Sequence, residues 1–531
     1  MFLKGGDVMD RFFAFLTLRS LDRQTRWLML GLVGLKLLLH AAVSTHWEFQ
    51  RDAFLYLAQA GHPAWGYFSA PPLTAWILAL VTGIFGDGVF VVRLIPALVS
   101  CMTLVIVIQM VQRLGGGRLA MLLAGISFLL SPAFLRTGTL IQPVVFDLFF
   151  WTLAGYALIR LIQTGGTRYW YILAVILALA WYAKYSIGVL ILAILPGLLV
   201  SRRRSLLFSH HPWLASLVGL LIILPNLAWQ WSYHWPVIHH MQELQTTQLV
   251  HVRLVEFLGM QLAMNAHAVV IWLAGIVALF VEWPNGRLRP LGWITVFVFV
   301  IIIQLQGKFY YTLGVYPLLM AVGGVALEFL LHRWHPRWGR LLLGLLILIG
   351  LPILPFGAPV LAPPKMAAYS DFWRTRGLQG LLRWEDGNLY QLPQDHADMI
   401  GWQAMAEMTL DAYASLSADE QARAILYGDN YGQAGALRYY GLKRGYAEPL
   451  CFNDQFLFWA PETLSADIIV ELSDPGDDPP PHYDHVKLVA TYENPLSRNH
   501  GARVYLCRGP QKALVEYYLN IIHWRKETFG H

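Results

Sequence analysis

Cysteine is scarce in this sequence, and so are charged side chains. The three cysteines among 531 residues, Cys101, Cys451 and Cys507, have no metal-ligand spacing. Cys101 lies in an apolar segment and should pack there, whereas Cys451 and Cys507 could form a disulfide in an oxidising compartment or stay two separate buried thiols. Charged residues make up only 14% of the chain and hydrophobic residues 56%, with a mean hydropathy of +0.47. This composition excludes a soluble protein and indicates an integral membrane protein.

Eleven apolar segments are long enough to cross a membrane as helices of about 17–25 residues. They lie at 26–43, 92–112, 119–135, 143–162, 169–183, 186–200, 213–230, 262–282, 290–305, 311–331 and 339–356. The basic residues Lys4, Arg11, Arg19, Arg23 and Arg26 precede no small-residue cleavage site, so we expect an uncleaved first helix. The shorter apolar stretch 71–85 begins with Pro-Pro, which predicts a helix lying along the membrane interface.

Arginine clusters predict the orientation of these helices. Basic residues flank alternate ends of the predicted spans, and such ends face the cytoplasm. The clusters are Arg19/Arg23, Arg113/Arg118, Arg160/Arg168, Arg202 to Arg204, Arg287/Arg289 and Arg333/Arg337/Arg340. The outer side then receives the first loop, 44–91, and everything after about 357. We therefore expect a transmembrane domain over 1–360 and a soluble outer-face domain over 361–531.

The segment after about 365 is more polar than the rest. Residues 424–429 predict a strand that leads into a helix over 433–440, and strand-like runs recur at 467–472, 487–492 and 503–507. A small α/β domain is therefore expected. The spacing of its glycines is not that of a GxGxxG motif, so we do not expect nucleotide binding.

Several short motifs stand in a specific order along the chain. The first loop has Arg51-Asp52 with Tyr56, then Gly66-Tyr67-Phe68 and Pro71-Pro72-Leu73, and Arg93 to Ala97 opens the next predicted helix. Later come Trp181 to Ser186, Gly307 to Tyr311 with Tyr316-Pro317, and Asp429 to Gly435 in the tail. In these motifs, over most of residues 44–330, the sequence resembles the bacterial membrane glycosyltransferases of family 39. These are relatives of the protein O-mannosyltransferases and of the lipid A aminoarabinose transferase.

The resemblance implies both a fold and a reaction. The fold is the mainly helical, polytopic GT-C type. The reaction is an inverting transfer of a sugar from a polyprenyl-phosphate donor at the outer face of the bacterial inner membrane, among membrane lipids. The acceptor would be a hydroxyl group of a lipid, a glycan or a protein. Neither a cofactor, a metal nor nucleic acid is expected.

Three ionisable residues fit this chemistry. Asp52 is the expected general base, because a carboxylate in this loop can take the acceptor's proton as the new bond forms. Lys184 and Lys308 are expected to hold the donor phosphate, with Tyr310 and Tyr311 beside them. Structural alternatives exist: Asp52 could pair with Arg51 in a solvated loop, and Lys184 could extend from a helix end to the interface.

Further substrate-binding candidates are Arg51, Tyr56, Tyr67, Gln142 and Asp147. Family members often carry Thr-Pro-Asp where this chain has Gln142-Pro143-Val144. The acid follows one helical turn later, at Asp147, inside a predicted span where a carboxylate is costly. The family also commonly has Asp-Glu where this chain has Asp52-Ala53. We therefore expect few acids near the site, which argues against a bound divalent ion.

Two other classes of function compete with transfer. A transporter or flippase of a lipid-linked or anionic substrate could use Asp147 and the outer lysines, but the sequence has no inverted repeat and no matched pair of broken spans. A non-catalytic assembly subunit would rest on the outer domain alone. The aromatic run 225–236 is either an interfacial belt or a sugar-stacking loop.

Overall fold

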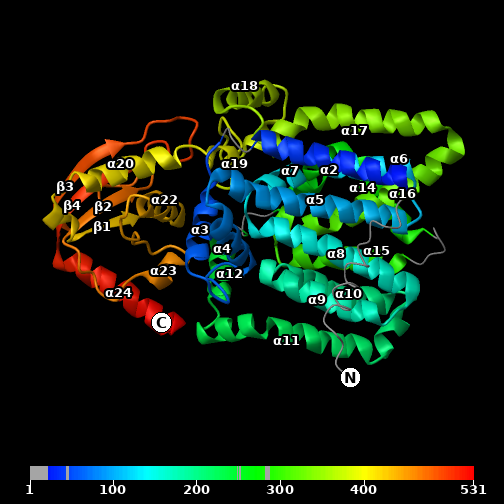
Figure 1. Ribbon diagram of the computed structural model, residues 1–531, viewed down its shortest axis with the longest axis horizontal. Coiled ribbons are helices and arrows are strands. Elements are labelled where there is room, and N and C mark those ends of the chain that lie inside the picture. The colour runs from blue at the N-terminus through cyan, green and yellow to red at the C-terminus, as the bar shows by residue number, and fades with distance from the viewer. Residues whose placement is uncertain (1–21, 44–46, 248, 250–252, 282–287, 531) are drawn as a thin grey trace.

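The computed structural model describes residues 22–43, 47–247, 249, 253–281 and 288–530 (Figure 1). Lys4, Arg11, Arg19 and Arg287 lie outside the described residues. Long apolar helices form a bundle, and a smaller α/β part lies at one end of it (Figure 1). The expected fold class, mainly helical with a small C-terminal sheet, is confirmed.

Each predicted span coincides with a helix or a bent pair of helices. Six segments of the described chain are long and apolar enough to cross a membrane: α2 (Arg23–Val43), α5 (Val89–Arg113), α8 (Pro143–Thr164), α11 (His211–Ser232), η5 (Phe309–Val315) running into α16 (Tyr316–Trp334), and α17 (Pro336–Gly357). Two pairs bend by 61° and 78°: α6 (Arg118–Leu129) with α7 (Pro132–Thr139), and α13 (Leu254–Met264) with η4 (Ala266–Ala268) and α14 (Val269–Phe280). The helices α9 (Arg168–Ala183), α10 (Ile187–Val200) and α15 (Arg289–Gln304) are shorter. Length and composition thus give six to eight spans, and eleven stays a prediction.

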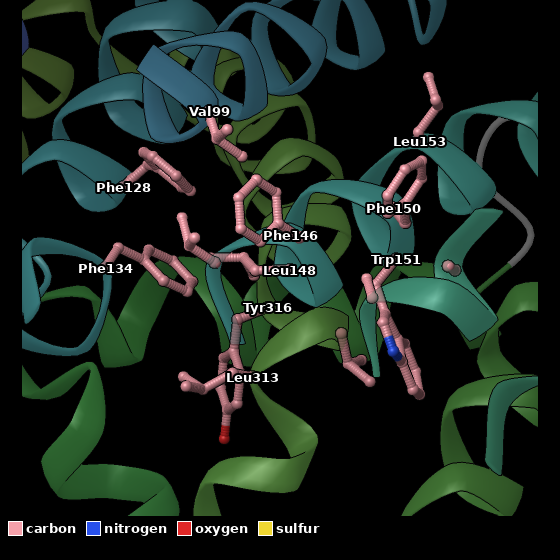
Figure 2. Packing of buried hydrophobic residues seen from close by; sticks show 14 of the residues in the cluster. Val99, Phe128, Phe134, Phe146, Leu148, Phe150, Trp151, Leu153, Leu313 and Tyr316 are labelled. Atoms are coloured by element: carbon pink, nitrogen blue, oxygen red, sulfur yellow. The ribbon is translucent and has the colours of Figure 1, made fainter. Parts of the chain in front are cut away.

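Small residues and aromatic rings set the packing of the bundle. A Cβ atom at Gly323 would lie 1.8 Å from the backbone oxygen of Ile271, so only glycine lets α16 approach α14 this closely. Phe128 and Phe134, on the two sides of the α6–α7 bend, stack with ring centroids 4.5 Å apart (Figure 2). The proline that begins α7 ends the preceding helix, and the stacked rings fill the resulting corner.

The first loop contains two helices, α3 (Arg51–Gly61) and α4 (Leu73–Phe85). The apolar stretch predicted to lie along the interface is α4, although its depth in a membrane stays a prediction. The expectation of an aromatic loop over 225–236 is largely wrong. The apolar face of α11 carries the helix on to Ser232, and only a short turn separates it from α12 (Pro236–Thr247).

The C-terminal part contains a four-stranded sheet in the order β1-β2-β4-β3. Its strands are β1 (Ala424–Gly428), β2 (Ile468–Ser473), β3 (Tyr483–Thr491) and β4 (Arg503–Pro510), with β1 parallel to β2 and the other pairs antiparallel. The helices are α18 (Pro363–Arg374), α19 (Gln394–Ala397), α20 (Trp402–Ala414), α21 (Ala418–Gln421), α22 (Tyr431–Leu442), α23 (Phe456–Trp459) and α24 (Lys512–Phe529), with η6 (Gln379–Leu382) after α18. All four predicted strands and the helix after β1 are present.

The cysteines do not pair with one another. Cys101, Cys451 and Cys507 are buried free thiols. Cys451 packs with residues of α3 and α22. Cys507 lies on β4 and packs instead with Ile469 of β2 and Tyr505 of β4. Of the two alternatives for Cys451 and Cys507, separate buried thiols are therefore correct.

Candidate active site

Asp52 lies in the first turn of α3, where local sequence fixes its position. Gln50 caps the helix, and its side-chain oxygen accepts a hydrogen bond from the Asp52 backbone N–H at 2.8 Å. A carboxylate in the first turn is favoured by the helix dipole. Arg93 of α5 is buried and donates to the backbone oxygens of Trp47 and Glu48, which holds the chain just before the cap. The motif residues Arg51, Asp52 and Arg93 are thus one structural unit.

Two hydrogen bonds orient the Asp52 carboxylate. Its Oδ2 accepts from Nε2 of Gln142 at 2.8 Å, and its Oδ1 accepts from the hydroxyl of Tyr431 at 2.7 Å. The side chain of Asp52 keeps 22% exposure, so the carboxylate can still be reached. Gln142 is the cap residue of α8, and Tyr431 is the first residue of α22 in the C-terminal part. The sequence anticipated Gln142 here but not Tyr431.

Charge holds Asp52 in its ionised form. Burial raises the pKa of Asp52, but the Arg51 guanidinium and the hydrogen bonds from Tyr431 and Gln142 outweigh burial, so the pKa lies below its ordinary value. The Nε of Arg51 lies 3.5 Å from Asp52 Oδ1, and its guanidinium also lies over the Tyr431 ring at 5.2 Å. The pair predicted as an inert alternative exists, but within a shared network rather than in a solvated loop.

Lys184 lies in the tight turn between α9 and α10. Its Nζ is 5.2 Å from the Tyr310 ring centroid and 4.9 Å from that of Tyr311. Asp147 supports this turn: its carboxylate accepts from Ser186 Oγ at 2.9 Å and from Trp151 Nε1 at 3.0 Å. The structure therefore brings Lys184, Tyr310 and Tyr311 together, as expected from the sequence. It also places Asp147, expected only as a substrate-binding candidate, at the turn that carries Lys184.

Lys308 has a partner that the sequence did not reveal. Its Nζ donates to Oε1 of Glu385 at 2.9 Å and lies 5.9 Å from the Tyr310 ring. The charge of Lys308 lowers the pKa of Glu385 against the effect of burial, so this carboxylate is ionised at neutral pH. Lys308 and Lys184 thus both lie over the ring of Tyr310, but the charge of Lys308 is already neutralised by Glu385.

Further acids face cations of the membrane bundle. Asp395 on α19 forms a two-contact salt bridge with Arg136 of α7. The backbone oxygen of Asp398 accepts from the Arg51 N–H at 3.2 Å, and burial raises the pKa of its carboxyl to about 6. The expectation of few acids near the site is therefore wrong. The acids come from segments more than 300 residues away from Asp52, where no local motif could reveal them.

The two remaining candidates differ in their surroundings. Tyr56 lies one turn after Asp52 on α3, and burial together with the Asp52 charge raises the pKa of its hydroxyl. Tyr67 is fully buried, and its hydroxyl donates to the backbone oxygens of Gln59 and His62 at 3.0 and 3.1 Å. Tyr56 therefore belongs to the Asp52 neighbourhood, whereas Tyr67 holds the shape of the first loop.

The aromatic run at the end of α11 has a clear packing role. Asn226 donates to the backbone oxygen of Trp65 at 2.7 Å and accepts from Trp181 Nε1 at 2.9 Å. Trp229 covers Gly66 so closely that a Cβ atom there would lie 2.4 Å from its ring. This run joins the first loop to the turn that carries Lys184.

Parts of the sequence are similar to known glycosyltransferases. The family model described as dolichyl-phosphate-mannose-protein mannosyltransferase matches residues 69–229. The lipid A galacturonosyltransferase RgtD of Rhizobium johnstonii is 22% identical over 186 residues, which are 34% of this chain and 38% of that protein. The match thus spans well under half of this relative's length.

Solved structures extend the likeness to nearly the whole chain. The crystal structure of ArnT from Cupriavidus metallidurans bound to undecaprenyl phosphate has a TM-score of 0.62 at 16% identity, covering 91% of this chain and 98% of that one. The same protein in its apo state has a TM-score of 0.58. At this identity the likeness concerns the fold. Together with the sequence matches, it confirms the resemblance to the membrane glycosyltransferases of family 39 and their GT-C fold.

Proposed function

We propose that this protein is an inverting glycosyltransferase that moves a sugar from a polyprenyl-phosphate donor to an acceptor hydroxyl. The observation that carries this proposal is the Asp52 carboxylate, ionised and held by Gln142 and Tyr431 beside a group of cations. The ArnT structure, whose fold this chain shares, was solved with undecaprenyl phosphate bound, which supports a polyprenyl-phosphate donor.

The reaction is a single displacement. The acceptor oxygen attacks the anomeric carbon of the sugar, and the bond from that carbon to the phosphate oxygen breaks on the opposite face, so the configuration inverts. The hydroxyl proton passes to Asp52 as the new bond forms. Tyr431 and Arg51 contact Oδ1 of the carboxylate and Gln142 occupies one lone pair of Oδ2, so the other lone pair of Oδ2 can accept the proton in a defined direction.

Lys184 is the principal cation for the donor phosphate. Among the described residues it forms no salt bridge, whereas Lys308 is paired with Glu385 and Arg136 with Asp395. The leaving polyprenyl phosphate needs positive charge more than it needs a proton, because a phosphate monoester is a good leaving group once it is neutralised. Lys308 assists after its contact with Glu385 is exchanged for the phosphate. Tyr310 and Tyr311 line the space between the two lysines.

The acceptor is proposed to be delivered by the membrane at its outer face. RgtD, which this chain resembles over one segment, is named for transfer to lipid A, and this supports a lipid-borne acceptor. The arginine clusters support placing Asp52, the loop 44–91 and the part after 361 on the outer side of the bacterial inner membrane. A transporter is not favoured, because Asp147 is engaged in holding the turn at Lys184.

Purified protein in lipid nanodiscs tests this function. It is incubated with a panel of polyprenyl-phosphate sugars and with lipid A as acceptor, and release of polyprenyl phosphate is followed together with the mass of the acceptor. We expect release and a mass gain with at least one donor, and neither with Asp52→Asn. Absence of transfer from the whole panel, or equal transfer by the Asp52→Asn variant, would contradict the proposal.

A further inference from the structure

A cavity lies in the C-terminal part. It has a volume of about 890 Å³, which suits a disaccharide-sized group. Its walls are α18, the turn around residues 384–392 and the loop around 495–500. None of the residues predicted from the sequence lines it, and neither does any member of the Asp52 hydrogen-bond network.

The lining combines a rigid aromatic wall with positive charge. Trp384 and Tyr390 stack with centroids 3.7 Å apart, and Trp384 Nε1 donates to the backbone oxygen of Leu392 at 2.9 Å. Arg374, Arg498 and His500 line the same space. Each faces a carboxylate: Arg374 pairs with Asp371, Arg498 with Asp398 and His500 with Glu493, so an anionic ligand would exchange for these contacts. Aromatic faces bind the apolar faces of sugar rings, and arginines bind phosphate or carboxylate.

The cavity lies beside the end of a candidate span. α18 follows α17 after a short connection, and the Tyr369 hydroxyl donates to the backbone oxygen of Pro352 at 2.6 Å, which ties the two helices together (Figure 1). Apolar side chains close to the cavity are exposed: Phe372 by 46% and Leu389 by 44%. A rim of this kind suits the membrane interface, where a lipid headgroup can enter sideways.

The back of the same wall contacts the candidate active site. Glu385, next to Trp384, holds Lys308 at 2.9 Å. On the other side of the cavity, Nη1 of Arg498 lies 3.4 Å from Asp398, whose backbone oxygen accepts from the Arg51 N–H. Two residues of the cavity wall are therefore linked to the candidate active site. Trp384 is next to Glu385, which contacts Lys308, and Arg498 contacts Asp398, which contacts the Arg51 backbone.

We propose that this cavity binds the anionic saccharide headgroup of the membrane-borne acceptor, with the sugar against Trp384 and Tyr390 and a phosphate or carboxylate on Arg374 and Arg498. This assignment rests on the proposed glycosyltransferase function. The cavity holds part of the acceptor apart from Asp52, so its contacts determine acceptor affinity rather than donor affinity.

The test measures equilibrium binding of labelled lipid A, a phosphorylated disaccharide lipid, to the full-length protein in nanodiscs. Tyr390→Ala combined with Arg374→Ala removes an aromatic contact and a charged contact at exposed positions. The matched control is Tyr517→Ala with Arg444→Ala, because Tyr517 is 60% exposed and Arg444 also pairs with an aspartate, yet neither lines the cavity. We expect lipid A binding at least about tenfold weaker in the cavity variant and unchanged in the control. Polyprenyl phosphate should bind equally to both, which also shows that the cavity variant is folded.

Further arms identify the ligand and its source. Dephosphorylated lipid A should bind weakly, and the deacylated phosphorylated disaccharide should compete only at higher concentration. Leu389→Glu, at the exposed rim, should also weaken binding of intact lipid A. Unchanged lipid A affinity in both variants, no lipid A binding by the wild type, or preference for the deacylated sugar would overturn the proposal. Normal lipid A binding without sugar transfer from any donor would instead overturn the proposed function and leave the ligand of the cavity in place.

Discussion

The membrane bundle and the C-terminal part contribute to the candidate site in opposite ways. The bundle and its first loop supply Asp52, Gln142 and the cations Arg136, Lys184 and Lys308. The C-terminal part supplies the acids Glu385 and Asp395, which neutralise two of these cations, and Tyr431, which orients Asp52. The bundle therefore provides reactive groups, whereas the C-terminal part adjusts their charge and direction. If the C-terminal part had no role in the reaction, substitutions that remove the contacts of Glu385, Asp395 and Tyr431 would leave the transfer rate unchanged.

The largest expected effect lies in the first loop. Asp52→Asn keeps the size of the side chain and much of its hydrogen bonding but removes the base, so transfer should fall by about 10²–10⁴-fold. Donor binding should change little, because Asp52 does not contact the phosphate cations directly. The measurement is initial-rate release of polyprenyl phosphate, with donor affinity determined in parallel. Transfer above about a tenth of the wild-type rate would exclude Asp52 as the base.

The two lysines of the bundle differ in their partners. Lys308 forms a salt bridge with Glu385, whereas Lys184 forms none among the described residues. Lys184→Ala should weaken donor binding by about 1.5–3 kcal/mol, because a charge-assisted contact to phosphate is lost. Lys308→Ala should cost less, since Glu385 already neutralises this lysine. Titration of each variant with a polyprenyl-phosphate sugar gives both affinities. Unchanged affinity in both variants would remove the phosphate-binding role from these residues, and a larger loss at Lys308 would reverse their order.

Glu385→Gln sharpens the comparison from the C-terminal side. It frees Lys308 without changing the shape of the turn, so donor affinity should rise a few-fold, on the order of 1 kcal/mol or less for a half-exposed pair. The same donor titration detects this gain, and Glu407→Gln, at a half-buried position of α20, is the control. A loss of donor affinity instead would show that Glu385 positions Lys308 rather than neutralising it.

The sheet of the C-terminal part has its own pH dependence. Burial and the charges of Asp429 and Asp477 raise the pKa of Glu471 to about 8, although Ser473 hydrogen-bonds the carboxylate. Because the folded pKa lies above the unfolded value, the folded state binds the proton more tightly. Stability should therefore be highest near or below pH 4.5, for this group alone, and should fall as the pH rises through about 8.

Glu471→Gln removes this dependence. The free energy of unfolding of the variant, measured by thermal unfolding, should decline less between pH 6 and about 8.5 than that of the wild type. The difference in this decline should be on the order of 1 kcal/mol. Glu516→Gln, at an exposed position of α24, should follow the wild type. Parallel curves for Glu471→Gln and the wild type would show that Glu471 ionises without cost.

The orientation of the two regions relative to the membrane can be measured by labelling. Cysteine introduced at Lys512, which is 91% exposed, should react with an impermeant reagent added outside the inner membrane, and one at Arg202 should not. The three native thiols are buried, so the background is low. Reversed labelling would place the site and the C-terminal part on the cytoplasmic side.

Residue patterns in the sequence predicted the helices, the four strands and the neighbourhood of Asp52. These features are local: apolar runs make helices, alternating runs make strands, and Asp52 and Gln142 each stand in a motif with a recognisable order. Tyr431 was visible only as part of a tail motif, Asp429 to Gly435, because nothing in its surroundings says that its hydroxyl reaches Asp52. Glu385 and Asp395 had no signal at all, since long-range charge pairing depends on how the two regions dock.

The pH dependence of transfer in Tyr431→Phe tests the central claim most directly. In the wild type, kcat/KM should fall at low pH as Asp52 takes up a proton, at a pH below the ordinary range for a carboxyl group. Tyr431→Phe removes one of the hydrogen bonds that lower this pKa, so the acid limb should move to higher pH. The same change removes one of the contacts that orient the carboxylate, so the rate at neutral pH should drop by up to about tenfold although Asp52 stays ionised. Tyr440→Phe, on the same helix, is the control and should keep the wild-type profile. An acid limb that Tyr431→Phe leaves in place, with an unchanged rate, would contradict the account that the C-terminal part tunes the base.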